Sequence, residues 1–94
     1  MEKQKIKNIR SRLGWSQTEL AKYMNVSRGA VAQWEIGKRT PSEVHEGILL
    51  QLEKRLDALD SERQKEKFKE DFVKVAVSSG VIALILWLFS ESNN

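Results

Sequence analysis

Signals that start and stop helices recur at short intervals through the first half of this chain. Residues 16–19, with the sequence SQTE, have the form of a capping box, in which the serine and glutamate side chains each bond the other residue's backbone N–H. Before it, Ile6, Ile9 and Leu13 recur at helical spacing, and Gly14 follows as a residue that commonly closes a helix. The pattern predicts one short helix that ends at Gly14 and a second that begins in the capping box.

The next stretch combines three features that a helix-turn-helix needs, which are a small contact residue, a permissive turn residue and apolar anchors. Ala21 is the small residue, and Asn25 tolerates the left-handed backbone of a tight turn better than most residues. Ser27 is a good N-cap for a third helix, which Gly37 can end. The apolar anchors expected in a three-helix core are Leu20, Met24, Val26, Val31 and Trp34.

Positive charge is concentrated in the same half of the chain. Residues 1–44 hold nine Lys and Arg against four Asp and Glu, whereas residues 45–74 hold seven against eight. Residues 75–94 carry one charged side chain, that of Glu91. A basic face on a small domain favours nucleic acid as the partner, because the phosphate backbone attracts cations.

The face of the third helix opposite its apolar anchors offers side chains suited to base recognition. A helix placed in the major groove presents its N-terminal residues to the base edges. Arg28 can bond bidentately to guanine and Gln33 to adenine. Gly29 and Ala32 allow close approach, with thymine methyl groups within reach. We therefore expect these four residues to read double-stranded DNA.

Residues 15–42, WSQTELAKYMNVSRGAVAQWEIGKRTPS, resemble the Cro/C1-type (XRE-like) helix-turn-helix family of phage and bacterial repressors, with its lambda-repressor-like fold. The matching residues are Gln17, Glu19, Leu20, Ala21, Val26, Ser27, Trp34, Glu35, Gly37, Lys38 and Arg39. The resemblance implies that Arg10 pairs with Glu35 and faces the DNA backbone. It also implies a homodimer on an inverted repeat, and phosphate contacts from Arg10, Gln17, Ser27, Lys38, Arg39 and Thr40.

The helix-start pattern returns with Thr40 as N-cap, Pro41 at the first helical position and Glu43 at the third. A fourth helix is expected to run from Thr40 to Leu59. Its leucines either pack back on the domain or form a dimer seam: Leu49, Leu52, Leu56 and Leu59. His45, the one histidine, is expected at the solvated surface because no second ligand or nucleophile accompanies it.

Two segments of biased composition follow. Nine of the twelve residues 60–71 are charged, with Phe68 the one apolar residue, so residues 60–74 are expected to form a charged spacer. Residues 75–90 carry no charge. As a straight helix they rise about 24 Å, short of a hydrocarbon core of about 30 Å, with Lys74 and Trp87 suited to anchor at the interfaces. A C-terminal membrane anchor is expected, and a helix in an oligomer interface is the alternative.

Residue types that the chain lacks narrow the function further. With no cysteine and one histidine, thiol catalysis, disulfides and common zinc sites are excluded, so no enzyme, metal or cofactor is expected. The sequence predicts an all-α protein with a helix-turn-helix domain at 1–59, a charged helical linker at 60–74 and an apolar helix at 75–90. The expected function is a DNA-binding transcriptional regulator, a repressor, at the cytoplasmic face of the membrane. The alternatives are a membrane-anchored adaptor that docks protein with the same fold, and a soluble regulator that oligomerises through its tail.

Overall fold

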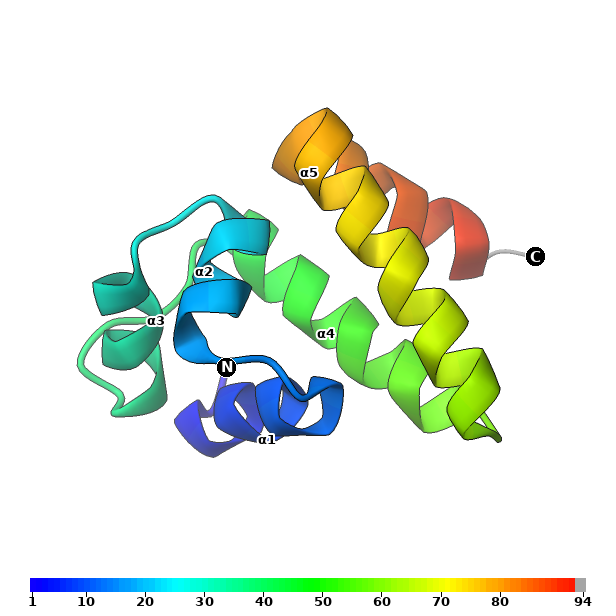
Figure 1. The fold of residues 1–94 in the computed structure, drawn as a ribbon. Coiled ribbons are helices and arrows are strands. Elements are labelled where there is room, and N and C mark those ends of the chain that lie inside the picture. The colour runs from blue at the N-terminus through cyan, green and yellow to red at the C-terminus, as the bar shows by residue number, and fades with distance from the viewer. Residues whose placement is uncertain (93–94) are drawn as a thin grey trace.

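The computed structural model describes the backbone of residues 1–92 and the side chains of residues 1–90, and all regular structure in that part of the chain is helical (Figure 1). The helices are α1 (Lys3–Leu13), α2 (Gln17–Met24), α3 (Arg28–Glu35), α4 (Glu43–Ala58) and α5 (Glu62–Ser92). In Figure 1, α1, α2 and α3 form one end of the molecule, α4 crosses its middle, and α5 covers the other end. The predicted all-α class is therefore confirmed.

The ends of the first helices follow the local signals in the sequence. Helix α1 stops at Gly14, whose φ of 71° is left-handed. Both hydrogen bonds of the capping box form between Ser16 and Glu19 at the start of α2, and that helix stops at Asn25, which is also left-handed with a φ of 55°. The Ser27 hydroxyl accepts the backbone N–H of Ala30 and caps α3. These contacts satisfy N–H groups that the first turn of a helix leaves free.

The predicted start of the fourth helix at Thr40 is wrong. Helix α4 begins at Glu43, and its N-cap is Ser42, whose hydroxyl accepts the backbone N–H of His45. Pro41 precedes the helix and is buried. Serine is the stronger N-cap of the two hydroxyl residues, and a start at Ser42 leaves the proline free to pack against the domain.

Helix α5 is a hairpin rather than one straight rod. Gly80 interrupts it with a φ of 82° and a ψ of −176°, a backbone conformation that is essentially restricted to glycine. Its two arms, residues 62–79 and 81–92, lie side by side (Figure 1). The uncharged run 75–90 is thus divided between the end of the first arm and most of the second.

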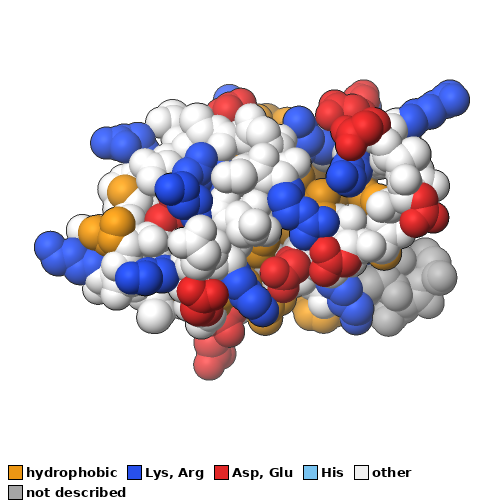
Figure 2. All heavy atoms as spheres, turned by 90° about the horizontal axis from the view of Figure 1, so that it is seen from below, with side chains coloured by type: hydrophobic (Ala, Val, Ile, Leu, Met, Phe, Trp, Pro, Cys, Tyr) orange, Lys and Arg blue, Asp and Glu red, His pale blue; other side chains and the backbone are white. Residues whose placement is uncertain are grey.

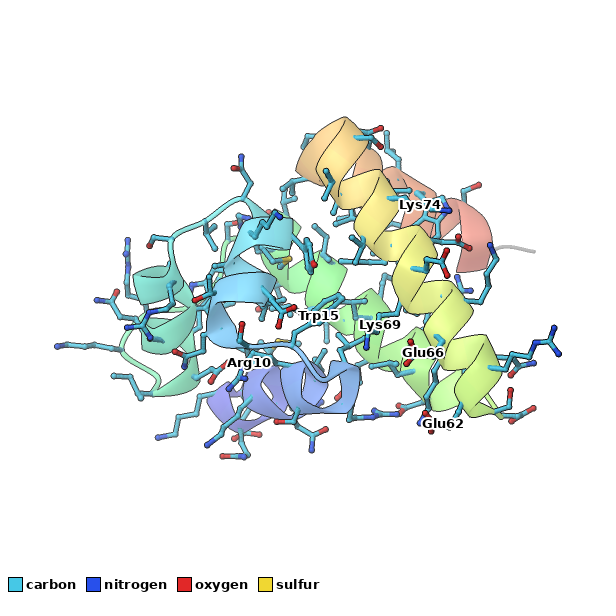
Figure 3. All side chains as sticks on the ribbon, viewed as in Figure 1. Arg10, Trp15, Glu62, Glu66, Lys69 and Lys74 are labelled. Atoms are coloured by element: carbon cyan, nitrogen blue, oxygen red, sulfur yellow. The ribbon has the colours of Figure 1, made fainter. Side chains whose placement is uncertain are left out.

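Most of residues 60–74, expected to form a charged spacer, lie in the first arm of the hairpin and pack against the domain. Phe68 and Phe72 lie one turn apart on the first arm and are buried, and Phe72 lies against Trp15 with a centroid distance of 5.4 Å. Figure 3 shows Trp15 between α1 and this arm. The charged side chains neutralise one another along the arm in the pairs Lys65–Glu62, Lys69–Glu66 and Lys74–Glu70. These two rings dock the charged part of the arm, and Val73, Val75 and Ala76 further along it pack against the same core.

The leucines of α4 pack within their own chain. Leu49, Leu52 and Leu56 are at most 2% exposed, and they share one core cluster with Leu84 and Leu88 of the second arm. A buried leucine contributes about 1.5–3 kcal/mol, so the two arms provide a substantial part of the stability. The prediction that these leucines pack back on the domain is confirmed for this chain, and α5 completes the core that they begin.

Candidate nucleic-acid interface

Helix α3 turns one side to the core and leaves its N-terminal half open. Val31 and Trp34 are buried, whereas Arg28 and Gly29 are exposed and Gln33 is half-buried beside Ala32. A Cβ added at Gly29 would meet only the Ser27 hydroxyl, at 3.8 Å, so the backbone there is accessible to a close partner. On the other side, Leu20, Ala21 and Met24 of α2 are at most 3% exposed, and Val26 of the turn is partly buried.

A chain of hydrogen bonds links the exposed side of α3 to α1 and α2. Arg10 donates from Nε and Nη2 to the two carboxylate oxygens of Glu35, at 2.7 and 2.9 Å, and from Nη1 to the carbonyl oxygen of Trp15, at 2.9 Å. The amide of Gln17 donates to Glu35 at 3.1 Å, and Gln17 Oε1 accepts Arg28 Nη1 at 3.0 Å. Arg28 is therefore oriented by a relay of side chains that starts in the interior.

The loop after α3 carries the next group of predicted contacts. Lys38, Arg39 and Thr40 are exposed, and Arg39 Nη1 donates to Gln33 Oε1 at 3.4 Å. Figure 2 shows mostly Lys and Arg projecting from the end of the molecule where α3 lies. No ion pair forms at Arg28, Lys38 or Arg39 within the described residues 1–92. These cations are thus free to meet phosphate or base oxygens.

Comparison with known proteins identifies the segment that contains these residues. Residues 6–44 match a family model described as helix-turn-helix. This segment is a helix-turn-helix domain of the Cro/C1 type. No curated protein and no solved structure gave a match to the chain.

The helix-turn-helix domain implies DNA binding and an intracellular location, and it suggests a transcriptional regulator. Regulators of this family are typically not enzymes.

Electrostatics keep the Arg10–Glu35 pair of this domain ionised. Burial by itself raises the pKa of Glu35. Hydrogen bonds from Arg10 and Gln17, together with the positive charges of Arg10 and Lys7, lower it by more. The pKa of Glu35 therefore lies below its usual value. The hydrogen bond to Glu35 raises the pKa of Arg10 further above its usual value, although burial opposes it. With all three guanidinium nitrogens bonded inside the domain, Arg10 is placed to position α3.

His45 is not the solvated surface residue that its isolation in the sequence suggested. Its Nε2 lies 2.8 Å from the carbonyl oxygen of Met24, the last residue of α2, and its Nδ1 lies 2.7 Å from Ser42 Oγ. The ring also lies against Trp34, with a centroid distance of 5.6 Å. His45 therefore fastens the start of α4 to the turn of the helix-turn-helix domain. Met24 and Trp34 belong to other helices, so no local pattern could have indicated these two contacts.

Lys3 is a further cation beside the interface that the sequence reasoning did not assign. A Cβ added at Gly37 would lie 3.0 Å from the Lys3 side chain, and the φ of 79° at Gly37 is left-handed. Lys3 thus packs against the loop that carries Lys38 and Arg39. The polar face of the first helix was visible in the sequence, but its position against this loop depends on how α1 packs on α3.

Proposed function

We propose that this protein is a sequence-specific DNA-binding transcriptional regulator, a repressor, that inserts α3 into the major groove. The observation that carries the proposal is the exposed N-terminal half of α3, whose Arg28 is held by Gln17 within the Arg10–Glu35 network. A side chain fixed before binding loses less conformational entropy when it meets its target. This arrangement suits recognition of a base edge at one position.

The proposed roles divide between two sets of residues. The first set reads base edges and comprises Arg28, Gly29, Ala32 and Gln33, because a helix in the groove presents its exposed N-terminal side. The second set binds phosphates and comprises Gln17, Ser27, Lys38, Arg39 and Thr40, whereas Arg10, expected in this set, has its guanidinium bonded inside the domain and positions α3 instead. Phosphate contacts supply affinity and register, whereas base contacts supply sequence discrimination. Loss of a residue from each set should therefore have a different consequence.

A dimer on an inverted repeat is the form in which we propose that the protein acts. One small module buries too little surface for tight specific binding, so two copies on two half-sites are needed. Leu49, Leu52 and Leu56 of α4 are already buried within one chain, so we propose that the dimer contact does not use them.

We also propose that the C-terminal segment attaches the regulator to the cytoplasmic face of the membrane. Helix Glu62–Ser90 is long and apolar enough to cross a membrane by length and composition, and only 17% of its most apolar 18-residue window is buried. Val77, Ile82 and Leu86 are each more than 60% exposed. Insertion as one span requires Gly80 to become helical and the second arm to leave α4.

Selection of bound sequences from random DNA by the full chain tests the DNA-binding proposal. The full chain is the right reagent because Phe68, Phe72, Leu84 and Leu88 complete the core. Enrichment of a two-fold symmetric sequence, lost in Arg28→Ala, is the expected result. If no sequence is enriched while the fold is intact, the domain docks a protein instead, as in the adaptor alternative.

Membrane fractionation tests the attachment with variants that spare the core. Leu86→Arg places a charge at a side chain that is 65% exposed, so it should leave the folded hairpin intact and release the protein from membranes. Leu50→Arg, at a leucine of α4 that is 42% exposed, is the matched control and should remain in the membrane fraction. If the unmodified protein is instead a soluble oligomer that Leu86→Arg dissociates, the segment is an assembly helix.

A further inference from the structure

A groove of about 370 Å³ lies where the end of α4 meets both arms of α5, away from the helix-turn-helix. Its walls include Arg55 of α4, Leu59 directly after α4, Arg63 and Phe68 of the first arm, and Trp87 of the second. Small-molecule sites commonly begin at about 300 Å³, so the groove can hold one compact ligand.

Aromatic rings form the apolar part of this groove. Phe68 and Trp87 are stacked, with ring centroids 5.9 Å apart and planes inclined by 12°. The Arg55 guanidinium carbon lies 4.9 Å from the centre of the Phe68 ring. Phe68 is buried but Trp87 is half-buried, so part of the stacked pair remains open to a flat partner. A planar ring is the shape that such a surface binds best.

The two arginines of the groove differ from the lysines of the first arm in having no carboxylate partner among the described residues. Lys65, Lys69 and Lys74 each have a carboxylate partner one turn away on α5. In the described part of the chain, Arg55 and Arg63 have no carboxylate within ion-pair distance.

Lys67, a further cation of the groove, pairs with Asp71, also in the wall, at 3.2 Å. The groove therefore has a surplus of two positive charges, both carried by arginine.

One of these arginines has an unused donor. Arg55 Nη1 is buried and has no hydrogen-bond partner, as is also true of Gln51 Oε1 one turn earlier on α4. A buried guanidinium N–H without an acceptor is costly, and either Gln51 Oε1 or an anion beside it would remove that cost. Arginine binds carboxylates bidentately, which fixes the orientation of the ligand as well as adding affinity.

We propose that this groove is a binding site for a small aromatic carboxylate. The ring of the ligand lies on the open part of Trp87, and its carboxylate binds Arg55 and Arg63. Because the walls come from α4 and from both arms, a bound ligand holds the hairpin closed. Helix α4 also carries His45 at its other end, where it bonds to Met24 at the turn of the helix-turn-helix. The site is distinct from the DNA-binding face, and its occupancy is measurable without DNA.

The probe for this site is 2-naphthoate, measured by calorimetry on the full chain. We expect saturable one-site binding and an increase in the unfolding temperature with ligand concentration, as for any ligand that binds only the folded state. Arg63→Gln should weaken binding by at least about ten-fold, because a charge-assisted hydrogen bond is lost. The matched control is Lys54→Gln, an exposed cation of α4 outside the groove, which should bind like the unmodified protein.

Uncharged 2-naphthalenemethanol separates the carboxylate contact from simple apolar adsorption. It should bind the unmodified protein at least about ten-fold more weakly than 2-naphthoate does. Its affinity for Arg63→Gln should equal its affinity for the unmodified protein. Equal affinities for the acid and the alcohol, or equal losses in Arg63→Gln and Lys54→Gln, would overturn the proposal. Binding of anionic lipid vesicles through Arg63 without binding of 2-naphthoate would overturn it too and would assign these arginines to a membrane surface. Because DNA affinity is not a readout here, this result is independent of the proposed regulatory function.

Discussion

Replacement of Arg10 by methionine tests whether the buried ion pair holds the recognition helix in place. Arg10 and Glu35 have side chains that are only 15% and 5% exposed, and they share two hydrogen bonds between α1 and the end of α3. Methionine keeps much of the apolar stem of arginine but removes all three donors. Glu35 would then be a buried carboxylate with only Gln17 as a hydrogen-bond donor.

The expected loss of stability follows from the burial of the partner left behind. Breaking a buried ion pair from one side costs about 3–5 kcal/mol, and residual exposure of Arg10 reduces this to about 2–4 kcal/mol. For a domain of this size, each kcal/mol lowers the unfolding temperature by about 4–8 °C. Arg10→Met should therefore lower it by about 8–32 °C.

A matched control lies two residues further along the same helix. Arg12 donates to Asp57 at 2.8 Å, but the side chains of that pair are 31% and 64% exposed. Exposed pairs contribute about 0–1 kcal/mol, so Arg12→Met should change little. Thermal and urea unfolding followed by circular dichroism give both values. Equal losses in the two variants would refute the claim that burial makes the Arg10 pair important.

The pH dependence of stability checks the same pair through its other member. The pKa of Glu35 is lower in the folded protein than in the unfolded chain, so its ionisation stabilises the fold above its ordinary pKa of about 4.3. This contribution is lost as pH falls through the lower folded value. Glu35→Gln should therefore be less stable than the unmodified protein at pH 7, and the difference should shrink below about pH 4. A difference that stays constant from pH 7 to 3 would contradict this assignment.

Three further predictions concern the interface, the contact between α2 and α3, and the hairpin. Arg28→Ala should lose discrimination at particular base pairs. Lys38→Ala should weaken binding to all DNA sequences alike and reduce by about one the slope of log affinity against log salt concentration. Equal losses of affinity on operator and random DNA for both variants would contradict these roles. Ala21→Leu should lower the free energy of unfolding by about 1–3 kcal/mol, because it separates α2 from α3; an unchanged urea midpoint would show a looser contact. Gly80→Ala should destabilise the hairpin by about 1–3 kcal/mol, because the φ of 82° at this position is strained for any residue with a Cβ. Gly29→Ala is the control and should not destabilise the protein, because a Cβ there has room. Urea unfolding measures both, and similar free energies of unfolding for the two variants would exclude backbone strain at Gly80.

Much of the candidate site could be predicted because its framework is local in the chain. The capping box at Ser16 and Glu19, the left-handed Asn25 and the cap at Ser27 each act over a few residues. Together they fix which side of α3 faces the core, so the exposure of Arg28 followed from spacing. The hydrogen bond from Arg28 to Gln17 and the position of His45 could not be predicted, because they depend on contacts between helices.

The sequence by itself determined the helix-turn-helix, its helix ends and its all-α class, because capping and apolar periodicity are properties of neighbouring residues. It also showed an uncharged segment that must avoid water. Only the tertiary structure decided where that segment lies. Gly80 turns the chain back, and Leu84 and Leu88 then reach the α4 leucines, while Phe68 and Phe72 dock the charged arm. Apolar residues specify that burial will occur, whereas the partner that buries them is chosen by the packing of the whole chain.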